Sequence, residues 1–125
     1  MGENPKEFDM LTLFQTTQVY FAREPVDMRK QIDGLALHVQ EVFELNPCTP
    51  ALFAFCNRQK DKVKILFWHD NGFCLIYKRI EKGRFQWPKN DEPSCVYSAR
   101  DLMWLLDGLS LSDLKPQKKL SYMKV

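Results

Sequence analysis

The sequence lacks an uninterrupted apolar run of about 18 residues, the length that a helix needs to cross a membrane. It also lacks a basic segment followed by an apolar one, which would indicate a secretory leader. From these two absences we expect a cytoplasmic protein without a membrane partner.

Cysteine and histidine are also too sparse and too scattered for a metal centre. The four cysteines, Cys48, Cys56, Cys74 and Cys95, form no C-x-x-C pair, and neither histidine stands near them at zinc-ligand spacing. They are typical of free thiols in a reducing compartment. We therefore predict no metal site, no cofactor and no disulfide.

Apolar residues are plentiful. The 125 residues are 45% hydrophobic and 13% aromatic, enough to bury a core without disulfides or metals. We expect residues 1–125 to form a single domain, with polar tails on either side of a core at about residues 18–109.

Charge is unevenly distributed, although the net charge is only +2. Residues 58–89 contain nine Lys and Arg against three Asp and Glu, a net +6, whereas residues 1–57 contain four against eight, a net −4. A basic segment of this kind suits a phosphate-rich partner, or it complements an acidic protein surface.

The segment 62–88 has the strongest local signal, because two long apolar runs meet at Asn71-Gly72, a favoured hairpin turn. A turn at these two residues would place Lys64 opposite Arg79. Both faces of the hairpin are apolar at its centre, so we expect another element to pack on each face.

The flanking patterns predict the other elements. Apolar runs bounded by turn residues indicate strands at 19–22, 51–56 and 84–87, and residues 89–97 read as a polar connector. Apolar residues at helical spacing predict a helix over 28–45 capped by Asp27, and Ser98 with Asp101 begins a second, short helix. The predicted fold is α+β, a four- to five-stranded, mainly antiparallel twisted sheet with one long helix on one face and a short C-terminal helix.

Basic and aromatic side chains alternate along the hairpin, a pattern suited to tracking phosphates and stacking on bases. The alternative is that the aromatic residues belong to the core and the cations only solubilise the edges of the sheet. The predicted nucleic-acid contacts are Arg58, Lys60, Lys64, Lys78, Arg79, Lys82, Arg84 and Trp87.

An enzyme would need converging catalytic groups. Metal-dependent phosphodiester chemistry requires two or three clustered carboxylates. The acids of the central region, Asp27, Asp33, Asp70 and Glu81, are mostly explained by a helix cap and two turns. We predict no catalytic residue, and a metal-dependent nuclease stays as the weaker alternative.

Several longer phrases resemble a known family. They are PVDMRKQIDGL at 25–35, the NR pair at 57–58, KILFW, NGFCLIYKR, EKGRFQWP and the closing WLLDGL at 104–109. Together they are similar to the accessory proteins, often called TnpB or Orf2, of bacterial transposable elements of the insertion-sequence sixty-six type. The family has an acidic residue directly after the tryptophan, where this chain has His69 followed by Asp70.

The resemblance implies a bacterial protein that acts beside the transposase of the same element, and it supplies no catalytic site. We therefore expect a non-enzymatic accessory protein of transposition that binds the transposase, element DNA, or both. The alternative is a protein-only scaffold or a dimeric structural subunit, and homo-oligomerisation stays open.

Overall fold

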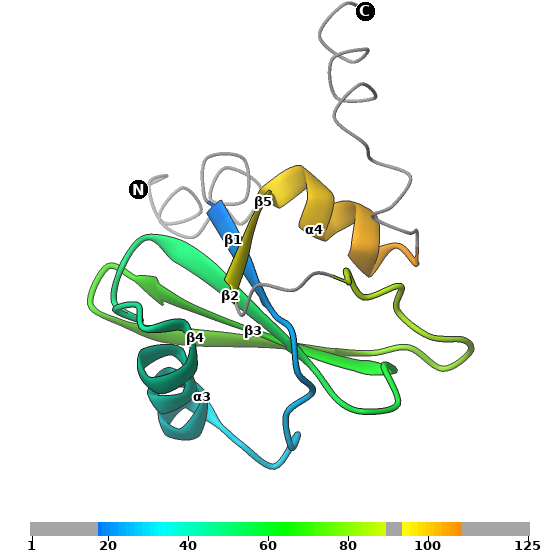
Figure 1. Cartoon of the computed structure of the whole chain (residues 1–125), viewed down its shortest axis with the longest axis horizontal. Coiled ribbons are helices and arrows are strands. Elements are labelled where there is room, and N and C mark those ends of the chain that lie inside the picture. Colours follow the sequence, from blue (N-terminus) through cyan, green and yellow to red (C-terminus); the bar gives the residue numbers. More distant parts are fainter. Residues whose placement is uncertain (1–17, 90–93, 109–125) are drawn as a thin grey trace, which may run out of the picture.

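The computed structural model describes residues 18–89 and 94–108. Five strands form one sheet in the order β4-β3-β2-β1-β5, with helices on both sides (Figure 1). The elements are β1 (Gln18–Ala22), α3 (Ile32–His38), η1 (Val39–Phe43), β2 (Ala51–Cys56), β3 (Lys62–His69), β4 (Gly72–Arg79), β5 (Ser94–Ser98) and α4 (Ala99–Leu106).

The sheet is mainly antiparallel, and the predicted α+β class is confirmed. The exception is the β1–β2 pair, which is parallel, so the chain crosses between these strands through α3 and the π-helical turn η1. The other three pairings, β1–β5, β2–β3 and β3–β4, are antiparallel.

The first helix begins four residues later than predicted, because residues 27–30 form a separate turn. The Asp27 carboxylate accepts from the Arg29 backbone N–H at 2.9 Å, and the Asp27 carbonyl accepts from the Lys30 N–H at 3.0 Å. Asp27 therefore caps this turn, while the N-cap of α3 is Gln31, whose side chain makes no capping bond.

A separate apolar cluster covers each face of the sheet, as the two-sided hairpin predicted. On one face, α3 and η1 contribute Leu35, Val39 and Phe43. On the other, α4 contributes Leu102 and Leu105. Strand β2, in the middle of the sheet, is buried along its whole length between the two clusters.

The predicted hairpin register is wrong by two residues. The loop consists of Asp70 and Asn71, and His69 pairs with Gly72. Asp70 takes the left-handed conformation, with φ of 61°, at the first loop position, so Gly72 is an ordinary strand residue. A shift of two residues keeps every side chain on its face, which is why the two-sided prediction holds. Lys64 lies opposite Tyr77 instead of Arg79.

Two predictions about the fifth strand are also wrong. Residues 84–87 form no strand, and the predicted connector contains β5, which pairs with β1. Phe85 and Trp87 instead lie in a segment without regular secondary structure, which packs on the same face of the sheet as α4. The helix that follows β5 begins as predicted, because Ser98 and Asp101 form a reciprocal capping box.

Candidate nucleic-acid interface

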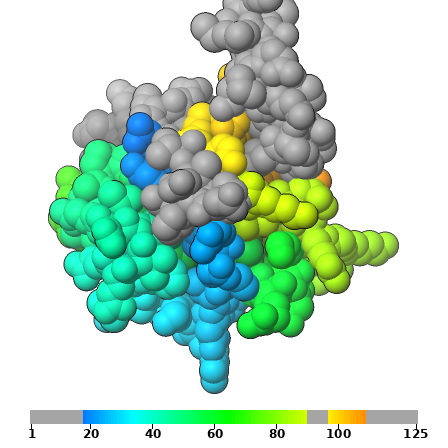
Figure 2. All heavy atoms as spheres, in the orientation of Figure 1, coloured from blue at the N-terminus to red at the C-terminus, as the bar shows by residue number. Residues whose placement is uncertain are grey.

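Two segments far apart in sequence meet at one end of the sheet. The turn between β2 and β3 is hydrogen-bonded to the chain that leaves β4. The Ile80 N–H donates to the Asp61 carbonyl at 3.0 Å, and the Phe85 N–H donates to the Lys60 carbonyl at 2.7 Å. Figure 2 shows the green and yellow-green atoms of these segments side by side at its lower right.

The β2–β3 turn is held in one conformation by the buried side chain of Asn57. Its amide oxygen accepts from the backbone N–H groups of Asp61 and Lys62 at 3.1 and 3.0 Å. Its amide nitrogen donates to the Asp61 carboxylate at 2.7 Å and to Gln59 at 3.2 Å. A turn fixed by four side-chain bonds presents its neighbouring cations in a defined arrangement.

Cations gather where these segments meet, and we call this surface the basic rim. Residues 58–62 and 78–84 contain seven basic residues against Asp61 and Glu81, a net +5. The basic residues are Arg58, Lys60, Lys62, Lys78, Arg79, Lys82 and Arg84. Lys62 was not among the predicted contacts, and it belongs to the basic rim because it pairs with Arg79 across β3 and β4.

Some rim charges are already paired. Arg79 donates to Glu81 at 3.0 Å, which raises the pKa of the guanidinium. Lys62 lies 3.4 Å from the Asp61 carboxylate, whose pKa is lowered mainly by the hydrogen bond from Asn57. Within residues 18–89 and 94–108, the exposed side chains of Arg58, Lys82 and Arg84 make no ion pair. These three are the rim cations with the most freedom to meet a phosphate.

Lys64 is not a surface contact, and its burial corrects the prediction. Its side chain is 5% exposed. Its ammonium donates to the carbonyls of Met28 and Lys30 at 2.9 and 2.8 Å, and it lies 5.8 Å from the centre of the Tyr77 ring. Lys64 therefore fastens the turn before α3 to the sheet.

Trp87, the one aromatic residue among the predicted contacts, is also internal, so this prediction is corrected too. It is 7% exposed, its indole N–H donates to the Ala22 carbonyl at 2.8 Å, and its ring packs edge-on against Phe21. This tryptophan anchors the segment of residues 84–87 to the end of β1.

Lys78 belongs to the rim and also reaches α4. Its ammonium donates to the carbonyl of Leu106, the last residue of α4, at 2.7 Å. A cation at a helix C-terminus satisfies a carbonyl that has no partner within the helix and matches the helix dipole.

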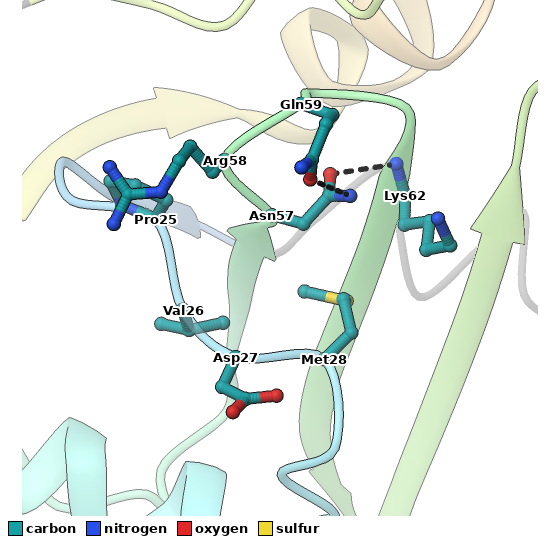
Figure 3. A pocket seen from close by; sticks show the side chains of 8 residues that line it. All are labelled: Pro25, Val26, Asp27, Met28, Asn57, Arg58, Gln59 and Lys62. Atoms are coloured by element: carbon teal, nitrogen blue, oxygen red, sulfur yellow. Dashed lines mark hydrogen bonds between the residues drawn. The ribbon is translucent and has the colours of Figure 1, made fainter.

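An open cleft of about 460 Å³ lies beside the rim. The linker after β1 forms one wall with Pro25, Val26 and Met28, and the β2–β3 turn forms the other with Asn57, Arg58, Gln59 and Lys62 (Figure 3). The Val26 N–H donates to the Cys56 carbonyl at 2.9 Å and holds the two walls together. The PVDM and NR phrases thus come together in space.

The linker also carries an exposed ion pair. The Arg29 guanidinium donates to both carboxylate oxygens of Asp27, with the closest approach at 2.7 Å. This bond and the Arg29 backbone N–H lower the pKa of Asp27 to about 2. Asp27 therefore holds Arg29 within the turn of residues 27–30.

Groups suited to metal or nucleophilic chemistry do not converge in the described part of the chain. No three His, Cys, Asp or Glu side chains there stand close enough to share a metal ion. Cys48, Cys56 and Cys74 are free thiols, and burial raises the pKa of Cys56 to about 12. Among the same residues, no helix is long and apolar enough to span a membrane.

The profile of a family described as IS66 Orf2-like protein matches residues 17–116. The chain belongs to the IS66 Orf2-like family. This confirms the resemblance, and it makes the protein a transposition-associated accessory protein. The chain is also similar to two proteins of comparable length from Sinorhizobium fredii (strain NBRC 101917 / NGR234).

The protein named "Uncharacterized protein y4hO" is 38% identical over 100 residues, which cover 80% of this chain and 87% of that protein. The protein named "Uncharacterized protein y4jC" is 26% identical over 98 residues, which cover 78% and 84%. No solved structure matches this chain at a significant level.

Proposed function

We propose that this accessory protein is not an enzyme and acts in the bacterial cytoplasm by binding element DNA, the transposase, or both, through the basic rim. The supporting observation is that three exposed cations come to one end of the sheet, Arg58 from one segment and Lys82 and Arg84 from another. Arg58 and Arg84 are 26 residues apart in the sequence. Because hydrogen bonds already fix the backbone of the rim, binding a phosphate backbone would order only these side chains. Contacts of this kind position a protein on a duplex.

The DNA arm of the proposal is tested by titrating salt against binding to a duplex carrying the element end. Affinity for phosphates falls steeply as salt rises, because bound counterions are released. In the variant Lys82→Gln/Arg84→Gln, we expect weaker binding and a salt slope shallower by about 2, one for each lost phosphate contact.

The matched control removes two exposed cations outside the rim, Arg23→Gln/Lys30→Gln. It makes the same change in net charge, so an equal loss in both double variants would indicate a non-specific charge effect and would contradict the assignment to the rim. An unrelated duplex of equal length separates recognition of the element end from general phosphate binding.

A protein-only scaffold is the second candidate. The observation in its favour is that Arg79 and Lys62 already pair with carboxylates of this chain. Carboxylates of an acidic protein partner could bind rim cations in the same way. A scaffold predicts no affinity for either duplex at low salt but capture by the element's transposase. Capture that requires the end DNA would instead support the DNA arm.

A further inference from the structure

Strand β4 is the last strand on one edge of the sheet that the described residues form (Figure 1). Among the residues that the structure describes, only β3 pairs with it. Soluble proteins usually protect such an edge with proline, inward-pointing charge or a very short strand. Here eight residues, GFCLIYKR, are paired along their whole length with β3, and the first six carry neither charge nor proline.

The register identifies the backbone groups that point outward. The pair that closes a two-residue hairpin is hydrogen-bonded, and bonded and non-bonded pairs then alternate. Because His69 pairs with Gly72, the even-numbered residues of β4 bond to β3, as the bond from the Ile80 N–H to the Asp61 carbonyl confirms at the next position. The N–H and C=O groups of Phe73, Leu75, Tyr77 and Arg79 therefore face away from the sheet.

We propose that a second copy of this chain occupies this edge, with the two β4 strands pairing antiparallel about a two-fold axis at Leu75. This arrangement brings the outward-facing backbone groups of the two copies together. It places Tyr77 opposite the partner's Phe73, and cross-strand aromatic pairs stabilise a sheet. Tyr77 is 51% exposed in one chain, so pairing would cover its ring.

Charge is compatible with a second copy as the occupant, and it favours this register over one centred on Ile76. The basic end of β4, Lys78 and Arg79, comes alongside the Asp70-Asn71 turn of the partner. Moving the axis to Ile76 would instead place Arg79 opposite Phe73, inside the partner's apolar stretch. An isologous two-fold pairing also closes on itself and leaves no free β4 edge to extend into a fibre.

The dimer does not require DNA, although Lys78 and Arg79 of the basic rim lie at its proposed ends, so the first test uses the protein alone. It measures the mass of the whole chain by sedimentation equilibrium at micromolar concentration. We expect twice the 14.8 kDa of one chain. A monomer, whether its edge is free or covered by another segment of the same chain, would overturn the proposal.

The second test removes one outward N–H. Tyr77→Pro should convert the dimer to a monomer, because the lost N–H faces the partner and an edge strand tolerates proline at such a position. Its matched control, Tyr77→Val, also loses the ring but keeps the N–H, and it should stay dimeric at higher concentration. A Tyr77→Pro protein that remains a dimer would show that another surface makes the contact.

The third test reads the register and does not depend on the proline variant folding. In a background with Cys48→Ser, Cys74→Ser and Cys95→Ser, Leu75→Cys should form an intermolecular disulfide on mild oxidation, because position 75 meets itself across the axis. Phe73→Cys, which would face Tyr77, should form it much more slowly. Equal or reversed rates would overturn the register.

Discussion

Two lysines on neighbouring strands each donate hydrogen bonds to backbone carbonyls, on opposite faces of the sheet. Lys64 of β3 donates to the carbonyls of Met28 and Lys30 before α3, and Lys78 of β4 donates to the carbonyl of Leu106 at the end of α4. Lys64 thus holds the turn that leads into α3 against the sheet, and Lys78 holds the C-terminal end of α4. The difference is that Lys64 is buried, whereas Lys78 is exposed within the basic rim.

The comparison shows that a basic residue in a strand has a role set by what lies over it. A buried ammonium is stable only when its donors are satisfied, and two carbonyls and an aromatic face do this for Lys64. An exposed ammonium loses little when its partner leaves, so the proposed contact with a phosphate would cost Lys78 only its bond to the Leu106 carbonyl.

The largest expected effect tests this contrast directly. Lys64→Met keeps most of the side-chain length but leaves two inward-facing carbonyls without their charged donor, so we expect a loss of about 2–4 kcal/mol in the free energy of unfolding. Lys78→Met, the matched exposed change, should cost less than about 1 kcal/mol. Urea denaturation measures both, and equal losses would contradict the different roles of the two lysines.

The two covering helices provide a smaller contrast. Ser98 caps α4 with a full capping box, whereas Gln31 at the start of α3 makes no side-chain cap. Ser98→Ala should destabilise the protein by about 1 kcal/mol, and Gln31→Ser should stabilise it by up to about 1 kcal/mol. Thermal unfolding measures both, and a neutral Ser98→Ala would show that α4 is held by packing alone.

The smallest effect concerns the exposed pair of Asp27 and Arg29. The pKa of Asp27 is lowered from 3.8 to about 2, so the pair stabilises the fold above pH 3.8 and the contribution disappears as pH falls toward 2. An NMR titration of the Asp27 carboxyl should find a midpoint near 2 that returns toward 3.8 in Arg29→Gln. An unchanged midpoint in that variant would assign the shift to the turn instead.

Patterns along the chain were sufficient for much of the fold. The hairpin, its two apolar faces, strand β2 and the Ser98 cap were predicted because each depends on residues that are close in sequence. The hairpin loop was misplaced because aspartate, like asparagine, accepts the left-handed conformation more readily than most residues with a side chain, and Asp70 adopts it, so Asn71-Gly72 was not the only suitable turn. Strand β5 was missed because its apolar run, Cys95 to Tyr97, is only three residues long and follows a polar segment.

The candidate site was predicted only in part for a related reason. Arg58, Lys82 and Arg84 are exposed as expected, but the sequence near Lys64 and Trp87 does not show that these two side chains are buried. Their partners are backbone carbonyls 34 to 65 residues away, at Lys30, Met28 and Ala22.

The sequence by itself determined which residues alternate between faces, that the chain reverses near residues 70–72, and that positive charge concentrates after residue 57. Only the tertiary structure decided which strands are neighbours, which cations are buried and which segments form the basic rim. The physical reason is that side-chain periodicity depends on local backbone geometry, whereas burial of a polar group depends on a partner that folding brings from a distant part of the chain.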